Sequence, residues 1–335
     1  MFKWILLASL LLCGCAAPKT KVRVLVPAEH GQVTRYRNIA VLPFTGDDAQ
    51  SIADELEAQL AVVIVKGKPF FNVVERERLT YALQELALSQ KGLLNPKNAL
   101  QVGRFIGAEA LYTGQVQTTR VDREYYEETR QECIEHKDPD KKRSKCLKYQ
   151  DKSVDCTRKT AHFRMIPKLI VVETGQIIYS KNIGKTAESA HCEDESSPPA
   201  NDQSLIDEAK QAAFQEFKRD IAPSYVEQEL TMMDDVDGLP ESASERFKAA
   251  LTFAEKDRMD RACTLWSETA QLASPTVAVI FNLGVCAETQ SDYAQALHYY
   301  HKVDGMLLKP DDIVSEALSR IRQKIRQQRS LKQQI

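Results

Sequence analysis

The sequence of 335 residues has little net charge and little glycine. Its 45 Lys and Arg residues nearly balance its 47 Asp and Glu residues, which gives a formal net charge of -2. Proteins bind nucleic acids through clustered Lys and Arg, so this balance gives no reason to expect a nucleic-acid partner. Only 13 residues are glycine, which argues against a glycine-rich or fibrous architecture. The length and the 43% hydrophobic content are typical of about two domains with buried cores.

The sequence also lacks the motifs of common enzymes. It contains no Gly-x-Ser-x-Gly and no His-Glu-x-x-His pattern, and we find no catalytic constellation. Gly184-Lys-Thr186 resembles the end of a phosphate-binding loop, but Tyr179 stands where that motif requires its first glycine. His298 and His301 are too few to ligate a metal. We therefore predict a protein that is not an enzyme and that uses no cofactor and no metal.

The N-terminus has the pattern of a signal peptide. Lys3 supplies a positive charge, and the apolar segment Trp4–Leu12 that follows is too short to span a bilayer as a mature helix. Leu12-Cys-Gly-Cys15 resembles the bacterial lipobox, whose cysteine becomes the acylated first residue of the mature protein. We therefore predict a signal peptide over residues 1–14. The alternative is an ordinary cleaved signal peptide.

Lipidation of Cys15 would anchor the protein without a membrane-spanning segment. Each buried methylene of an acyl chain contributes roughly 0.8 kcal/mol, so a multiply acylated cysteine binds a membrane stably. Ala16 follows the cysteine, and resemblance to lipoproteins without an acidic residue at this position favours the outer membrane. We expect residues 15–35 to form a lipid-anchored tether, although Lys21–Pro27 also fits an edge strand.

Six of the eight cysteines remain once Cys13 is assigned to the signal peptide and Cys15 to the lipid. They are Cys133, Cys146, Cys156, Cys192, Cys263 and Cys286. An exported chain meets an oxidising compartment, where an even set of cysteines can pair, and six cysteines allow 15 pairings. The alternative is a zinc site that combines the first four with His136 and His191. Their irregular spacing and the oxidising compartment favour disulfides.

Strand-length apolar runs alternate with helical patterns between Tyr36 and Thr118. The predicted strands are Tyr36–Phe44, Phe70–Val74 and Leu111–Thr118, followed by a hairpin of Met165–Glu173 and Gln176–Asn182. A first helix has Ile52, Leu56, Leu60 and Val63 on one face, and Asp48 is a candidate for its N-cap. Leu79, Leu83 and Leu86 mark a second helix. A third helix begins at Asn95-Pro96. This alternation predicts an α/β domain, a sheet covered by helices.

Four segments of this region also resemble one known family. They are Ile39-Ala-Val-Leu-Pro-Phe44, Asn72-Val-Val-Glu-Arg-Glu-Arg-Leu79, Gly92-Leu-Leu-Asn-Pro96 and Gly107-Ala-Glu-Ala-Leu-Tyr-Thr-Gly114. In this order they resemble the CsgG family, bacterial outer-membrane lipoproteins whose best-known member is the curli secretion channel. The resemblance covers about the first two thirds of the chain. It implies a CsgG-like α/β domain over residues 36–230 and a lipoprotein that faces the periplasm from the outer membrane.

A charged segment interrupts this domain at residues 122–160. From Asp122 to Lys159, 21 of 38 residues are charged, and three of the candidate disulfide cysteines lie among them. The hairpins of the curli channel form its membrane pore, which requires an apolar residue at every second position. Neither this segment nor the acidic stretch Ser189–Ser204 has such alternation. We therefore expect a soluble, disulfide-bonded insertion that is available to a partner.

The C-terminal part contains an internal repeat with a period of 34 residues. The pairs are Phe247 and Phe281, Ala250 and Gly284, Ala262 and Ala296, and Trp266 and Tyr300. Their small and aromatic residues resemble the tetratricopeptide repeat, as do Asn282-Leu-Gly284 and Tyr293-Ala-Gln-Ala-Leu297. We predict a linker at 231–241, an all-α domain of two such repeats at 242–308, and a capping helix at 309–335. Two unrelated helical hairpins are the alternative.

These features predict a non-enzymatic lipoprotein that assembles or supports an envelope or surface machine. Its partners would be the outer membrane, through the anchor, and proteins that bind the repeat domain or the charged insertion; a homo-oligomer is left open. One alternative is an activator of a cell-wall synthase, but a tether of about twenty residues reaches at most roughly 70 Å. The other is a subunit of a curli-type secretion pore, against which the charged insertion argues.

Overall fold

The computed structural model describes residues 17–47, 49–86, 96–138 and 145–335. Its contacts divide the chain into two units. One contains the described residues up to Pro27 together with Tyr225–Gln333, and the other contains Ala28–Ser224 with Gln334–Ile335. Cys15, the signal peptide and the cap Asp48 lie outside the described residues, as do Asn95 and most of the segment from Gly92 to Pro96.

A mixed sheet forms the centre of the unit from Ala28 to Ser224. Its strands are β2 (Asn38–Gly46), β5 (Asn72–Val73), β6 (Ala110–His136), β7 (Cys146–Val171), β8 (Ile177–Ser180) and β9 (Ile183–Cys192). The order is β5-β2-β6-β7-β8, and β9 also pairs with β7. β2 is parallel to β5 and β6, while the pairs that involve β7 are antiparallel. A short pair of strands, β3 (Ile64–Val65) and β4 (Lys68–Pro69), stands apart.

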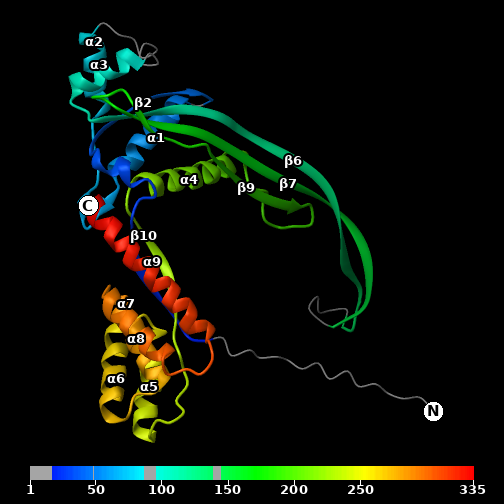
Figure 1. The fold of residues 1–335 in the computed structure, drawn as a ribbon. Helices are drawn as coiled ribbons and strands as arrows, with labels where there is room; N and C mark the ends of the chain where they lie inside the picture. The colour runs from blue at the N-terminus through cyan, green and yellow to red at the C-terminus, as the bar shows by residue number, and fades with distance from the viewer. Residues whose placement is uncertain (1–16, 48, 87–95, 139–144) are drawn as a thin grey trace. The chain divides into compact units, whose positions relative to one another are not determined.

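Helices cover both faces of this sheet, as the sequence predicts (Figure 1). They are α1 (Ala49–Ala61), α2 (Arg76–Glu85), α3 (Pro96–Ile106) and α4 (Asp202–Ile221), with a 3-10 helix, η1, at Gly31–Arg35. On one face α4 lays Phe214 and Phe217 against Phe163 and Tyr112, at ring distances of 6.3 and 5.4 Å. On the other face the apolar side of α2 and α3 packs against β2 and β6. Residues Ile39–Leu42 of β2 are at most 1% exposed, because both faces of this strand are covered.

The second unit is mainly helical. It contains α5 (Glu241–Ala254), α6 (Met259–Leu272), α7 (Val277–Thr289), α8 (Tyr293–Asp304) and α9 (Asp312–Gln334), and a two-stranded sheet of β1 (Lys19–Val26) and β10 (Ser224–Thr231). The aromatic residues of the 34-residue period are fully buried and meet in pairs: the ring distance is 6.3 Å for Phe247 and Trp266, and 5.1 Å for Phe281 and Tyr300. A Cβ at Gly284 would lie 2.6 Å from the Tyr300 ring, which explains the small residue there.

Two segments that we expected to link other parts are themselves folded. Residues 15–35, expected as a tether, contain β1 and η1, because Val24 and Val33 bury their side chains. Residues 231–241, expected as a linker, pack into the helical unit. Met232 is fully buried, and the amide of Asn282 exchanges two hydrogen bonds with the backbone of Met233, at 3.0 and 2.8 Å. A buried side-chain amide that both donates to and accepts from the backbone of one residue fixes the path of the chain there.

Candidate interaction site

The most extended feature of the sheet is the hairpin of β6 and β7. The two strands pair from Ala110 opposite Val171 to His136 opposite Cys146. β2 stops pairing with β6 at Val116, and β9 stops pairing with β7 at Cys156, so the strands continue beyond their neighbours (Figure 1). We call residues 118–136, 146–164 and 184–192 the arm. At about 3.3 Å per residue, the 19 residues of its β6 segment span roughly 60 Å.

The described residues of the segment 122–160, which we expected to form an insertion in the α/β domain, lie mostly in strands β6 and β7 of the arm. The strand predicted over Leu111–Thr118 continues to His136, and the charged segment returns as β7 in register with it. Sequence patterning did not reveal these strands because charged side chains occupy both faces of the arm, so the apolar alternation of a half-buried strand is absent. The only local signals were the threonine, tyrosine and valine residues between the charges, which favour extended backbone.

Ion pairs across the strands replace apolar packing on one face of the arm. Arg158 of β7 contacts Glu124 of β6 at 2.8 Å and Glu188 of β9 at 3.0 Å, so it joins all three strands. The same guanidinium lies 4.9 Å from the centre of the Tyr126 ring. Exposed pairs of this kind each contribute at most about 1 kcal/mol, and they keep the surface hydrophilic.

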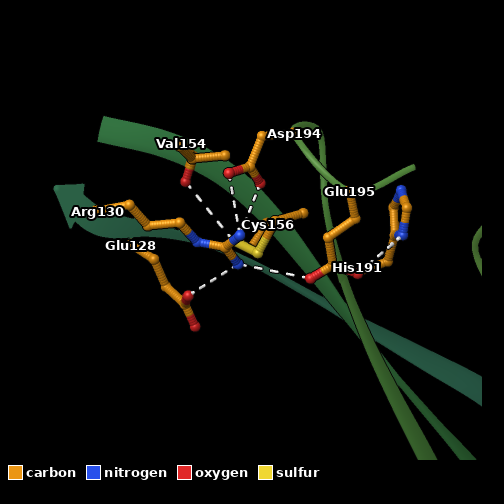
Figure 2. Close-up of a disulfide and its surroundings, with 8 residues drawn as sticks. Glu128, Arg130, Val154, Cys156, His191, Asp194 and Glu195 are labelled. Carbon is orange, nitrogen blue, oxygen red and sulfur yellow. Dashed lines mark hydrogen bonds and ion pairs between the residues drawn. A yellow bond between two sulfur atoms is a disulfide. The ribbon is translucent and has the colours of Figure 1, made fainter. Parts of the chain in front are cut away.

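A second arginine, Arg130, lies among three carboxylates where β9 ends (Figure 2). Arg130 contacts Asp194 at 2.9 Å, Glu128 at 3.2 Å and Glu195 at 3.4 Å. The hydrogen bond to Glu128 is the largest of several interactions that raise the pKa of Arg130. The turn after β9 is therefore attached to β6 by one cation that contacts three carboxylates.

Three disulfides join the six cysteines whose pairing the sequence left open. Cys156–Cys192 ties β7 to β9 beside Arg130, Cys133–Cys146 ties the far ends of β6 and β7, and Cys263–Cys286 ties α6 to α7. Val154 and Tyr126 pack around the Cys156–Cys192 bridge.

The zinc alternative does not fit this arrangement. Glu128, Cys156 and Cys192 bring three potential ligand atoms within 4.8 Å of one another, and Cys133 lies 3.8 Å from a ring nitrogen of His136. The sulfur atoms of all these cysteines are in disulfides, however, and a metal ligand must be a thiolate. With the bridges formed, these residues hold the arm together and offer no sulfur ligand.

The arm also exposes large apolar side chains. Tyr125 and Tyr149 lie on one face and are 76% and 58% exposed. Ile134 and Leu147 stand at irregularities in the pairing near the tip, next to the Cys133–Cys146 bridge, and are 48% and 56% exposed. Exposed aromatic side chains in a charged surface are the usual anchors of protein interfaces. Sequence reasoning did not single out these four residues.

The remaining predicted positions have simple structural roles. Gly184-Lys-Thr186 lies within β9 and does not precede a helix, so the resemblance to a phosphate-binding loop is not supported by the fold. His298 and His301 are exposed on α8. Among residues 17–47, 49–86, 96–138 and 145–335, no helix has the length and apolar character needed to cross a membrane.

Comparisons with known proteins give one family match over part of the chain and distant likenesses to solved structures. Residues 12–124 match the family described as curli production assembly/transport component CsgG, about a third of the chain, where the sequence motifs suggested two thirds. No curated protein was found to match the chain. The LpoB C-terminal domain from Salmonella enterica is 16% identical, with a TM-score of 0.26, over 47% of this chain and 94% of that one.

Two further solved structures show a similar degree of likeness. Lipoprotein GNA1162 from Neisseria meningitidis is 10% identical, with a TM-score of 0.29, over 54% of this chain and 97% of that one. PelC from Paraburkholderia phytofirmans, described as a dodecamer, is 13% identical, with a TM-score of 0.24, over 61% of this chain and 98% of that one. These values are too low to transfer a function.

Proposed function

We propose, from the match of residues 12–124 to the CsgG family and from the arm, that this protein is an envelope lipoprotein with a scaffolding role. It would be anchored in the outer membrane through Cys15, face the periplasm and hold other proteins of an envelope or surface machine. The observation that carries the proposal is the arm itself. It is long, charged on both faces, braced by two disulfides and marked by exposed tyrosines, features that suit a protein contact more than chemistry.

The helical unit would supply a second contact surface. Its two helical hairpins, α5 with α6 and α7 with α8, bury the residues of the 34-residue period, and α9 covers the core they share. We propose that they are tetratricopeptide-like repeats with α9 as their cap. Two repeats bury little apolar surface alone, so a covering helix and the Cys263–Cys286 bridge would stabilise them.

The two alternative functions fit the structure less well. Only residues 16–18 separate Cys15 from β1, which shortens the reach that an activator of a distant cell-wall synthase needs. A pore subunit would place arm charges such as Arg130 and Arg158 in lipid, and each basic residue at the bilayer midplane costs about 2 to 4 kcal/mol. We therefore propose that the arm stays in water and does not form a pore.

The anchor is tested by replacing its cysteine. Cys15→Ser should leave an uncleaved precursor or a soluble protein, because no acyl chain can be attached to serine in this pathway. Cell fractionation followed by immunoblotting measures the result, with Cys13→Ser as the matched control that should stay in the outer membrane. If the Cys15→Ser protein still sediments with the outer membrane after a high-salt wash, Cys15 is not the anchor.

The scaffolding role is tested by crosslinking in living cells. A photoreactive residue in place of Tyr125 or Tyr149 should give discrete crosslinked proteins, identified by mass spectrometry and by the reciprocal crosslink. The control position is Val62, which is 68% exposed but lies between α1 and β3, outside the arm. Equal crosslinking from all three positions, or unitary conductance of the purified protein in planar bilayers, would contradict the proposal.

A further inference from the structure

At the base of the arm, a pocket of about 460 Å³ opens on one face of the three-stranded sheet. Its walls come from two rows of directly paired residues, one from each of β6, β7 and β9. Thr118, Arg164 and Gly184 form the first row, and Arg120, His162 and Thr186 form the second. Residues paired across an antiparallel sheet share a face, so these side chains project together.

Two further lining residues contribute backbone and not charge. Phe163 and Lys185 alternate with the two rows, and their side chains lie on the opposite face: Phe163 packs against Phe214, and Lys185 pairs with Glu216 of α4 at 2.5 Å. The positive charge of the pocket therefore comes from Arg120 and Arg164, with His162 beside them.

The donors in the pocket exceed the acceptors. Asp122 accepts from the Nε of Arg120 at 3.1 Å and lies 3.2 Å from Nε2 of His162, which leaves the terminal nitrogens of Arg120 free of this carboxylate. The guanidinium of Arg164 has no hydrogen-bond or ion-pair partner among the described residues. It extends over Gly184, where a Cβ would lie 3.4 Å from its Nε. The glycine leaves room for it.

We infer that this pocket binds a phosphate group carried on a molecule about the size of a sugar. Two guanidinium groups and two threonine hydroxyls offer more donors than the two oxygens of a carboxylate can use, whereas a phosphate presents three or four oxygens. Bidentate contacts of arginine with phosphate are among the strong charged hydrogen bonds. A volume of about 460 Å³ lies within the usual range for small-molecule sites and exceeds the needs of a bare ion. This site is independent of the proposed scaffolding role.

Such a group could reach the pocket from a soluble sugar phosphate or from a phospholipid headgroup, and the experiment separates these sources. The full-length lipoprotein in neutral detergent is titrated by calorimetry with glucose 6-phosphate, with glycerophosphoglycerol as a headgroup diester, and with glucose as the uncharged control. We expect binding of at least one phosphate compound that weakens with added salt, and no heat from glucose. The compound that binds more tightly identifies the source.

Three variants locate the binding. Arg164→Gln should weaken it by about tenfold or more, because a charged hydrogen bond is lost. Gly184→Leu should weaken it similarly by filling the pocket while all charges remain. Arg158→Gln removes the same charge from the same face but outside the pocket, and should change the affinity by less than about twofold. The inference is overturned if no phosphate compound binds at millimolar concentration, or if Arg158→Gln weakens binding as much as Arg164→Gln.

Discussion

Replacing Glu288 by alanine is expected to destabilise the helical unit by about 3 to 5 kcal/mol, the usual cost of removing one partner of a buried ion pair. Glu288 is fully buried on α7. Its carboxylate lies 2.9 Å from Arg320 and 2.8 Å from Lys324, both on α9, and it accepts a hydrogen bond from the hydroxyl of Tyr300 at 2.7 Å. Without it, Arg320 and Lys324 on α9 lose the buried carboxylate that they share. The packing of α9 on α7 would then lose its buried ion pairs, while the apolar contacts remain.

Urea unfolding followed by tryptophan fluorescence measures this effect. The sequence has two tryptophans, of which Trp4 lies in the predicted signal peptide, so Trp266 in the core of the helical unit reports the transition. The matched control is Glu316→Ala. Glu316 is 70% exposed and lies 3.7 Å from the same Arg320, and its loss should cost less than about 1 kcal/mol. Equal effects of the two substitutions would show that burial of Glu288 is not what matters.

The same cluster predicts a pH dependence. Burial by itself would raise the pKa of Glu288, but the hydrogen bonds and charges of Arg320 and Lys324 outweigh it, so this pKa lies below its ordinary value of 4.5. A carboxyl with a depressed folded pKa stabilises the fold above its unfolded pKa, and this contribution is lost as the pH falls through the folded value. Wild type should therefore lose more stability than Glu288→Gln when the pH falls below about 4.5. If the free energy of unfolding of the two proteins falls in parallel with pH, the depressed pKa of Glu288 does not contribute to stability.

Removal of the Cys156–Cys192 bridge is the second change with a large expected effect. The bridge closes a loop of 36 residues, and its loss corresponds to about 4 kcal/mol in the chain-entropy model. The double variant Cys156→Ala with Cys192→Ala keeps a small apolar group at both buried positions. We expect faster amide hydrogen exchange at the end of β9 and in the turn that contacts Arg130, because the bridge lies where the pairing of β9 with β7 stops.

Two controls separate the cross-link from other effects. In wild type treated with a reducing agent, the amides of β9 should exchange as fast as in the double variant, since both proteins lack the Cys156–Cys192 bond. The variant Cys133→Ala with Cys146→Ala opens a loop of only 13 residues at the far end of the arm and should leave β9 protected. Unchanged exchange of β9 in the Cys156 and Cys192 variant would show that strand pairing alone holds this segment.

The sequence by itself determined the elements whose apolar residues follow one clear period. The face of α1 with Ile52, Leu56 and Leu60, the start of α3 at Pro96 and the hairpin of β7 with β8 were predictable, because burial of one face requires a matching repeat. The aromatic residues 34 apart likewise marked a repeating helical unit, and the predicted export signal led us to expect that the six later cysteines would pair.

Only the tertiary structure decided the parts held by polar contacts between distant residues. The arm is extended because strands that are separated in sequence exchange backbone hydrogen bonds and ion pairs, such as Arg158 with Glu124 and Glu188. Neither interaction leaves an apolar pattern in the sequence. Strand register and helix docking likewise decide which cysteines pair. They also decide that Arg120 lies in one row with His162 and Thr186, and which residues contact Glu288. The positions of these groups depend on how distant segments of the backbone pair and pack, which no local sequence pattern records.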